Sequence, residues 1–258
     1  MENTEQTGHP LNHSELYKNK IKVMVSEPTL GWIHHQVYDN RKDFVMEIAR
    51  YEAKSDYKFF TMNTGRLLIS YARELICDQA ISTNMDYLLF IDDDMIVPHN
   101  LFEHLIQIDA DIVAPLCTTR NFPFEPVVYR SEISDQESDG SFKLKNTSVT
   151  DIERNKIVDA ETVGFGVVLI KVDILKKIPK PWFFVNQAVG EDILFCIRAR
   201  QHIPDFKIKI NTGLIVGHMG DPEIRTIKDY DRIKGTPEYE TFLKQYRPQM
   251  EPKCQNIA

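Results

Sequence analysis

The sequence predicts an α/β protein with an open, mostly parallel sheet flanked by helices. Apolar runs with the length and composition of strands alternate with segments of helical periodicity, which is typical of this class. One of these runs, "YLLFI", stops on three consecutive aspartates, Asp92 to Asp94. Because ligands of such sheets bind outside the carboxyl ends of the strands, the aspartates mark a candidate site.

The first half of the chain alternates strands and helices. Residues 20–25 predict a first strand, a helix is expected around 43–53, and residues 57–62 predict a second strand. The next helix, 66–80, has the clearest periodicity. Its apolar stripe consists of Leu67, Leu68, Tyr71, Ala72, Leu75 and Ile76.

A third strand ends on the aspartates, and a short helix follows it. Asn100 precedes the apolar positions Leu101 and Leu105, and Glu103 stands where it could close a capping box with Asn100. Residues 111–117 predict a further strand.

The second half departs from this order. A polar stretch predicts a hairpin excursion, after which a glycine-containing strand passes into a helix, a second helix starts near Glu191, and two strands follow. We therefore expect a polar N-terminal extension at 1–19, a single domain at 20–220 with its excursion at 131–156, and a C-terminal tail at 221–258 that wraps the domain.

The composition is that of an ordinary globular protein. Of its 258 residues, 42% are hydrophobic, and the net charge of −7 argues against a broad nucleic-acid surface. No apolar run is long enough to span a membrane, and the N-terminus has no signal-peptide pattern. The scattered cysteines predict free thiols and a cytoplasmic location; they are Cys77, Cys117, Cys196 and Cys254.

Three adjacent carboxylates are costly without a partner. Two like charges about 4 Å apart repel by roughly 1 kcal/mol in water and about 4 kcal/mol near a protein surface. A cation, a proton or full solvation must therefore compensate them. If the strand continued through the aspartates, Asp92 and Asp94 would point to one side and could flank a ligand, with Asp93 on the other. A solvated acidic turn would explain the same residues.

Two arginines of the predicted helix 66–80 lack a local acid. Arg66, Ser70, Arg73 and Cys77 fall on one helical face, and neither arginine has an Asp or Glu three or four residues away. Two such guanidinium groups suit a bidentate anion such as a diphosphate, although solvated surface arginines would look the same.

Later motifs add acids and an imidazole. Glu191 and Asp192 stand at the start of a predicted helix, where the dipole alone would favour acids by about 0.3 to 1 kcal/mol. His218 lies between Gly217 and Gly220, which would let the backbone come close to a ligand. A structural role would explain each motif alone, and their order along the chain is more specific than any one of them.

Together these motifs resemble those of nucleotide-sugar-dependent glycosyltransferases of the GT-A fold, most of all the family 2 group. The resemblance covers roughly 20–220 and is carried by "DYLLFIDDDM", "VGFGVVLIKVDIL", "PWFF", "GEDILFCIRAR" and "VGHMG". It implies that Asp92 and Asp94 form the DxD motif that holds a metal and the sugar nucleotide. By the same resemblance His218 completes the metal site, Arg73 helps to bind the nucleotide, and Asp192 of the pair with Glu191 acts as base in an inverting transfer.

The resemblance also suggests the chemistry. Carboxylates suit Mg²⁺ or Mn²⁺, an imidazole ligand favours Mn²⁺, and the ion would stabilise the departing diphosphate. Gly164 and Gly166 would leave room for the donor and acceptor sugars. A UDP-sugar is the expected donor. Many members hold uracil with an Asp near the first strands, but this chain has Ser26, Glu27 and Pro28, which leaves the base open.

Two other functions share part of the pattern. A metal-dependent nucleotidyltransferase also uses carboxylates at strand ends, but the chain has no GxxxxGK sequence. A non-catalytic sugar-nucleotide-binding protein would need only some of the acids, and the presence of Asp92, Asp94, Asp192 and His218 weighs against it. The acceptor hydroxyl, on a glycan, protein, lipid or modified nucleobase, and the choice between inverting and retaining transfer stay open.

Overall fold

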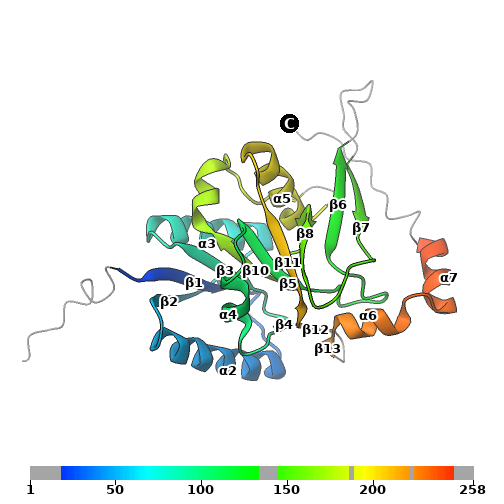
Figure 1. Cartoon of the computed structure of the whole chain (residues 1–258), viewed down its shortest axis with the longest axis horizontal. Helices are drawn as coiled ribbons and strands as arrows, with labels where there is room; N and C mark the ends of the chain where they lie inside the picture. The colour runs from blue at the N-terminus through cyan, green and yellow to red at the C-terminus, as the bar shows by residue number, and fades with distance from the viewer. Residues whose placement is uncertain (1–18, 134–143, 186–188, 221–223, 247–258) are drawn as a thin grey trace, which may run out of the picture.

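The computed structural model describes residues 19–133, 144–185, 189–220 and 224–246, and its centre is a seven-stranded sheet (Figure 1). The strands of this sheet, in chain order, are β1 (Ile21–Glu27), β2 (Tyr57–Asn63), β3 (Tyr87–Ile91), β5 (Ile112–Leu116), β8 (Ile157–Ala160), β10 (Val167–Lys171) and β11 (Ile208–Ile215). Their spatial order is β2-β1-β3-β10-β5-β11-β8. β10 and β8 run against the direction of the other strands. The predicted α/β class, with an open and mostly parallel sheet, is confirmed.

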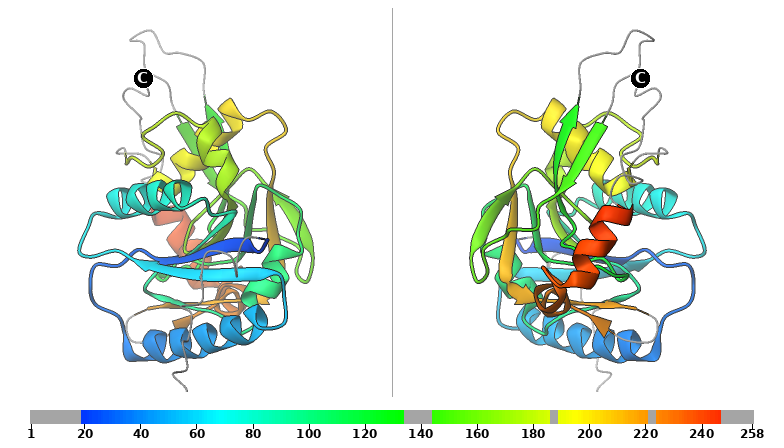
Figure 2. Two further views of the ribbon diagram at one scale, coloured as in Figure 1. Left: turned by 90° about the vertical axis from the view of Figure 1, so that its left-hand side faces the viewer. Right: turned by 90° about the vertical axis from the view of Figure 1, so that its right-hand side faces the viewer.

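Helices cover both faces of the sheet. One face carries α2 (His35–Glu52) and α4 (Leu101–Ile106), and the other carries α3 (Ile69–Ser82), the 3-10 helix η1 (Val172–Lys177) and α5 (Glu191–His202). Figure 2 shows β1 and β2 between α2 and α3. Because side chains alternate along a strand, Val23 packs in the layer of α2 and Met24 in the layer of α3.

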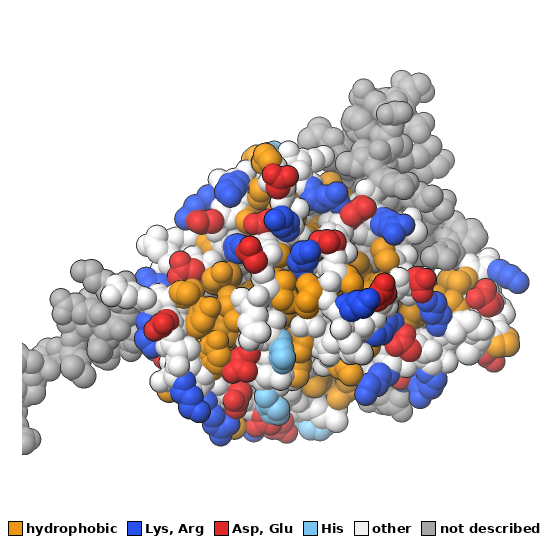
Figure 3. All heavy atoms as spheres, in the orientation of Figure 1, with side chains coloured by type: hydrophobic (Ala, Val, Ile, Leu, Met, Phe, Trp, Pro, Cys, Tyr) orange, Lys and Arg blue, Asp and Glu red, His pale blue; other side chains and the backbone are white. Residues whose placement is uncertain are grey.

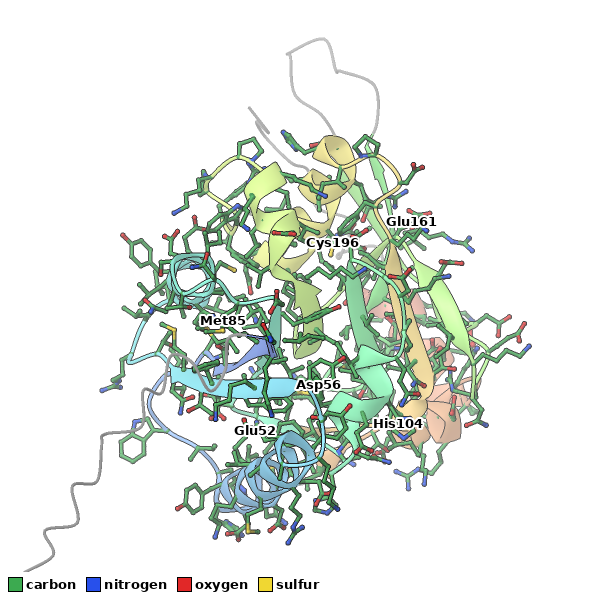
Figure 4. The ribbon with its side chains drawn as sticks, turned by 60° about the vertical axis from the view of Figure 1, so that its left-hand side comes forward. Glu52, Asp56, Met85, His104, Glu161 and Cys196 are labelled. Atoms are coloured by element: carbon green, nitrogen blue, oxygen red, sulfur yellow. The ribbon has the colours of Figure 1, made fainter. Side chains whose placement is uncertain are left out.

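The edge strand β2 is tied to α2 by Glu52, labelled in Figure 4. Its carboxylate accepts hydrogen bonds from Lys58 Nζ at 2.6 Å and from the Phe59 amide at 2.8 Å. This connection holds the helix that forms one wall of the pocket described below.

Two helix starts differ from expectation. α2 begins at His35, well before residue 43, and α3 begins at Ile69, so Arg66 lies in the preceding loop. Half of the apolar stripe predicted for residues 66–80 faces solvent: the exposed fractions of Leu68, Tyr71 and Leu75 are 78%, 71% and 46%. The helix is instead turned so that Arg73 points inward, because acids elsewhere in the molecule pair with it.

The predicted capping box is wrong. Asn100 precedes α4, but its side chain makes no capping hydrogen bond. Its backbone (φ −89°, ψ 16°) is not extended, as a capping residue usually is, and its Nδ2 lies 2.9 Å from Nε2 of His104 instead.

The excursion is a hairpin, as predicted. β6 (Val128–Ile133) pairs with β7 (Leu144–Ser148) and with β9 (Thr162–Val163), while residues 134–143 lie outside the described part of the chain. A second small sheet joins β4 (Met95–Ile96), β12 (Gly217–Met219) and β13 (Ile224–Arg225).

The tail contains α6 (Ile227–Ile233) and α7 (Pro237–Tyr246). Ile227, Tyr230 and Tyr239 are buried in the main hydrophobic core, so this segment is part of the domain. Of the predicted N-terminal extension, only residue 19 is described. Among the described residues no helix has the length and apolar character needed to cross a membrane, and Cys77, Cys117 and Cys196 are buried free thiols.

Candidate functional site

The three aspartates lie in a turn, and the strand does not continue through them. β3 ends at Ile91, the amide of Met95 donates to the carbonyl of Asp92 at 3.1 Å, and β4 begins at once. The amide of Asp92 donates to the carbonyl of Gly166 at 2.8 Å, which fixes the turn against the start of β10. Asp92 and Asp94 meet different cationic partners, whereas Asp93 accepts from a backbone amide.

Arg73 connects Asp92 with the start of α5. Its Nη2 lies 2.9 and 3.0 Å from the two carboxylate oxygens of Asp92, and its Nε donates to Glu191 Oε1 at 3.2 Å. The guanidinium is buried over the rings of Phe90 and Phe165. Its Nη1 has no hydrogen-bond partner within the described ranges. A buried charge must be paired, and these long-range acids are the partners that helix α3 lacks.

The acids around Arg73 form one electrostatic cluster. Burial, reinforced by the charges of Asp94 and Asp192, raises the pKa of Asp92 to about 7 against the opposing effect of Arg73. The pKa of Asp192 is also raised, first by burial and then by the charge of Glu191. A carboxyl group perturbed as Asp92 is can hold or accept a proton near neutral pH.

Asp192 is aimed by backbone amides. Its Oδ1 accepts from the amide of Ile193 at 2.8 Å and its Oδ2 from the amide of Phe165 at 3.2 Å. A methyl group on Gly164 would lie 3.4 Å from Oδ2 of Asp192, so Gly164 borders this acid. Gly166 has another neighbour, because its added methyl group would meet Met95 Sδ at 3.2 Å.

His218 reaches Asp94 because β12 pairs with β4, directly after the turn. Its Nε2 lies 3.1 Å from Asp94 Oδ2, and its Nδ1 lies 2.7 Å from the carbonyl of Thr118. A carbonyl only accepts hydrogen bonds, so Nδ1 carries a proton and Nε2 faces the carboxylate. Nη1 of Arg120, a residue that sequence reasoning missed, lies 3.3 Å from the same oxygen of Asp94.

The two members of this pair shift each other's pKa. Burial by itself would raise the pKa of Asp94, but the hydrogen bond and charge of His218, with the charge of Arg120, outweigh it and lower that pKa. Burial by itself would lower the pKa of His218, but the hydrogen bond and charge of Asp94 outweigh it and raise that pKa. The pair is therefore ionised over a wide pH range in the absence of other ligands.

The donor set of Asp94 and His218 fits a divalent cation. A ligating histidine usually donates its second ring nitrogen to a carbonyl or carboxylate, as His218 Nδ1 does here. No three His, Cys, Asp or Glu side chains of the described residues gather closely enough to form a complete metal site. Two protein ligands would leave positions for phosphate oxygens and water, which Mg²⁺ and similar ions commonly retain.

Arg66 does not join Arg73. It is exposed, and its Cγ would lie 3.1 Å from a methyl group added to Gly31, so it packs against the loop that follows β1. The two arginines predicted on one helical face are separated because α3 starts after Arg66.

A pocket of about 740 Å³ opens beside the turn, at the carboxyl ends of β1 and β2. Arg41 of α2 links the pocket to the turn: its Nε donates to Glu27 at 2.7 Å, and its Nη2 donates to the carbonyls of Asp92 at 3.1 Å and Met95 at 3.4 Å. The pocket is lined by Glu27, Thr29, Gly31, Ile33, Tyr38, Arg41, Lys42, Asp43, Val45, Met46 and Asn63.

Sequence reasoning missed Arg41 because α2 was expected to start after it. The signal that singled out Arg73 is nevertheless present: residues 37, 38, 44 and 45 are Val, Tyr, Phe and Val, so Arg41 also has no acid three or four residues away. Of the arginines described above as lacking a local acid, Arg73 and Arg41 hold the aspartate turn from inside the molecule, whereas Arg66 does not.

Fold and site together define an α/β protein with a buried cluster of acids and arginines at the carboxyl ends of parallel strands. On the face shown in Figure 3, acidic and basic side chains are interspersed, without a broad basic surface. No family model and no curated protein matches the sequence.

Several solved structures are distantly similar. A197 from STIV has 19% identity and a TM-score of 0.48, over 76% of this chain and 85% of that chain. A glycosyltransferase involved in the glycosylation of the major capsid of PBCV-1 has 14% identity and a TM-score of 0.39, over 73% and 80%. HddC from Yersinia pseudotuberculosis has 10% identity and a TM-score of 0.37, over 82% and 97%. Similarities at this level carry no functional argument, so function must be inferred from the side chains.

Proposed function

We propose that the protein is a metal-dependent glycosyltransferase of the GT-A type, which transfers a sugar from a nucleoside diphosphate sugar to a hydroxyl acceptor. A UDP-sugar is the first candidate donor. The observation that carries the proposal is the bridge from Asp92 through Arg73 to Glu191. It joins the DxD turn and the acidic start of α5 in one site, although they are far apart in the chain.

The site offers a separate place for each part of such a donor. The pocket of about 740 Å³ beside the turn has room for a nucleoside. Next to it, Asp94, His218 and Arg120 face one position, which suits a diphosphate with its cation. A bound Mg²⁺ or Mn²⁺ would supply positive charge to the departing diphosphate. The sugar would then lie toward Gly164 and Asp192.

Asp192 is the candidate base. Its pKa is raised by burial and by the charge of Glu191, which favours proton uptake, and two backbone amides hold its orientation. In an inverting transfer the acceptor oxygen bonds to the anomeric carbon, the bond from that carbon to the diphosphate oxygen breaks, and the acceptor proton passes to Asp192. Glu191 and Arg73 would keep the start of α5 in place beside Asp92.

A binding experiment followed by product analysis tests the proposal. Mn²⁺-dependent thermal stabilisation is measured with a panel of nucleoside diphosphate sugars, and the binding donor is then incubated with candidate acceptors. Glycosyl transfer releases the nucleoside diphosphate, whereas nucleotidyl transfer from the same donor would release a sugar 1-phosphate and a binding protein would release neither. Retention of the donor's anomeric configuration, seen by NMR, would contradict the inverting assignment.

Two variants test the assigned residues in the same assay. Asp94→Asn should abolish turnover and most of the Mn²⁺-dependent stabilisation, because it removes a charged ligand oxygen and keeps the shape. Asp192→Asn should lose most of the rate and keep donor and metal affinity, because its contribution arises mainly in the transition state. Full activity of Asp192→Asn would remove it as the base.

A further inference from the structure

The pocket and the aspartate turn are joined by two side chains that the proposed chemistry does not use. One is Arg41, which lines the pocket and donates to two carbonyls of the turn. The other is Asp93, the middle aspartate, whose Oδ2 accepts from the amide of Leu30 at 3.2 Å. Leu30 belongs to the pocket loop, residues 28–34, which connects β1 to α2 and forms one side of the pocket.

Side chains, and not strand pairing, hold the pocket loop. The amide of Thr29 donates to Thr64 Oγ1 at 3.3 Å, and the amide of Gly31 donates to Thr29 Oγ1 at 2.9 Å. Together with the bond from Leu30 to Asp93, three successive amides of the loop bind side-chain oxygens. The position of this wall therefore depends on Asp93, and a shift of the loop is transmitted to the turn.

Arg41 forms a second connection between the pocket and the aspartate turn. One edge of its guanidinium is held by Glu27, and Nη2 is held by the carbonyls of Asp92 and Met95. Its Nη1 is buried and has no hydrogen-bond partner in the described part of the chain. An unpaired buried donor next to a pocket favours a ligand with an acceptor oxygen or nitrogen. Because the guanidinium is planar and rigid, a ligand bound to Nη1 would also fix the carbonyls bound to Nη2.

We infer that Arg41 contacts the nucleoside in the pocket, and that Arg41 and Asp93 couple occupation of the pocket to cation binding at Asp94 and His218. Arg41 is thus a ligand-contacting residue, and Asp93 is a positioning residue that acts through the pocket loop. The inference rests on the proposed function, since it takes the occupant to be the nucleoside part of the donor. Coupling between two sites is reciprocal, so each ligand must tighten the other by the same factor.

A nucleoside without phosphates is the decisive probe, because it cannot reach the cation through a diphosphate. Mn²⁺ is titrated calorimetrically into the protein, alone and with saturating uridine, cytidine, adenosine or guanosine. In the natural protein, we expect the bound nucleoside to increase the affinity for Mn²⁺ by about fivefold or more. Fivefold is the lower end of the usual coupling between two sites.

The variants separate the coupling from a charge effect. Asp93→Ala and Asp93→Asn lose the same charge, but only Asn keeps an acceptor for the Leu30 amide. Asp93→Asn should therefore retain the coupling and Asp93→Ala should reduce it to less than about twofold. Arg41→Lys should also lose the coupling, and it should lower the affinity for the nucleoside. Arg50→Lys, on the exposed part of the same helix, should change neither the coupling nor this affinity.

Each outcome bears on one proposal. Three results would overturn the inference and leave the proposed function intact. The nucleoside could bind without changing the Mn²⁺ affinity, or the coupling could be equal in all variants. Nucleoside diphosphates could also bind although no nucleoside binds. If neither nucleoside diphosphates nor nucleoside diphosphate sugars bind in the presence of Mn²⁺, the proposed function fails, and this inference fails with it.

Discussion

Arg73 balances the charge of the buried acids. Arg73→Ala would leave the carboxylates of Asp92 and Glu191 without their cation, and breaking a buried pair in this way usually costs about 3 to 5 kcal/mol. We expect a loss of this size in the free energy of unfolding, measured with urea. Arg50→Ala is the control, because its exposed pair with Glu47 should contribute about 0 to 1 kcal/mol. Equal effects of the two substitutions would contradict the assigned role of Arg73.

His218 should make cation binding depend on pH. A cation needs the neutral imidazole, and the pKa of His218 is raised above 6.5 by Asp94 despite its burial. Mn²⁺ affinity should therefore fall, by up to about tenfold per pH unit, below that raised pKa. In His218→Gln the dependence should become shallower, and the remainder should reflect Asp92, whose pKa is about 7. Titrations between about pH 5.5 and 8.5 measure both.

The contribution of His218 to the stability of the metal-free protein should depend on pH in the opposite direction to Mn²⁺ affinity. Because the folded-state pKa of His218 is raised, its contribution is complete below the unfolded value near 6.5 and is lost as pH rises through the folded pKa. The lowered pKa of Asp94 means that its contribution is lost as pH falls through that value. If the contribution of the Asp94 and His218 pair to the free energy of unfolding increased above pH 7, this assignment would be contradicted.

Strand β12 positions His218, and Gly217 allows its pairing. A methyl group at residue 217 would lie 2.5 Å from Ile224 Cγ2 and 3.2 Å from Ile96 Cβ, inside the small sheet of β4, β12 and β13. Gly217→Ala should destabilise the protein by about 1 to 3 kcal/mol. It should also lower the affinity for Mn²⁺, because it moves His218. Gly65→Ala, where an added methyl group meets nothing within 4 Å, is the matched control. Unchanged Mn²⁺ affinity in Gly217→Ala would show that β12 does not set the position of His218.

Helices α6 and α7 complete the core of the molecule. Ile227, Tyr230 and Tyr239 are at most 4% exposed. Burial of one such side chain contributes about 1.5 to 3 kcal/mol, so a chain that ends at residue 220 should lose about 4.5 to 9 kcal/mol of stability through these three side chains. Urea unfolding of the shortened and full chains measures this loss. A shortened chain of unchanged stability would show that the domain ends at residue 220.

The local residue pattern determined the class of fold and the candidate acids. Alternating apolar runs predicted the strands and helices, and the run that ends at Ile91 placed the aspartates at a strand end. The sequence also singled out Arg73, Asp192 and His218, because each stands in a local pattern that a single segment displays. Such patterns depend on neighbours within one helical turn or a few strand residues, so a sequence contains them in full.

Only the tertiary structure decided which of these groups meet. Arg73 and Glu191 are separated by 118 positions, and Asp94 and His218 by 124, yet both pairs are in contact. The antiparallel insertion of β10, the rotation of α3 that buries Arg73, and the link from Arg41 to the turn likewise depend on segments remote in sequence. Periodicity and composition describe each segment alone. Long-range pairs form because buried charges and backbone groups must find partners wherever the packed chain brings them.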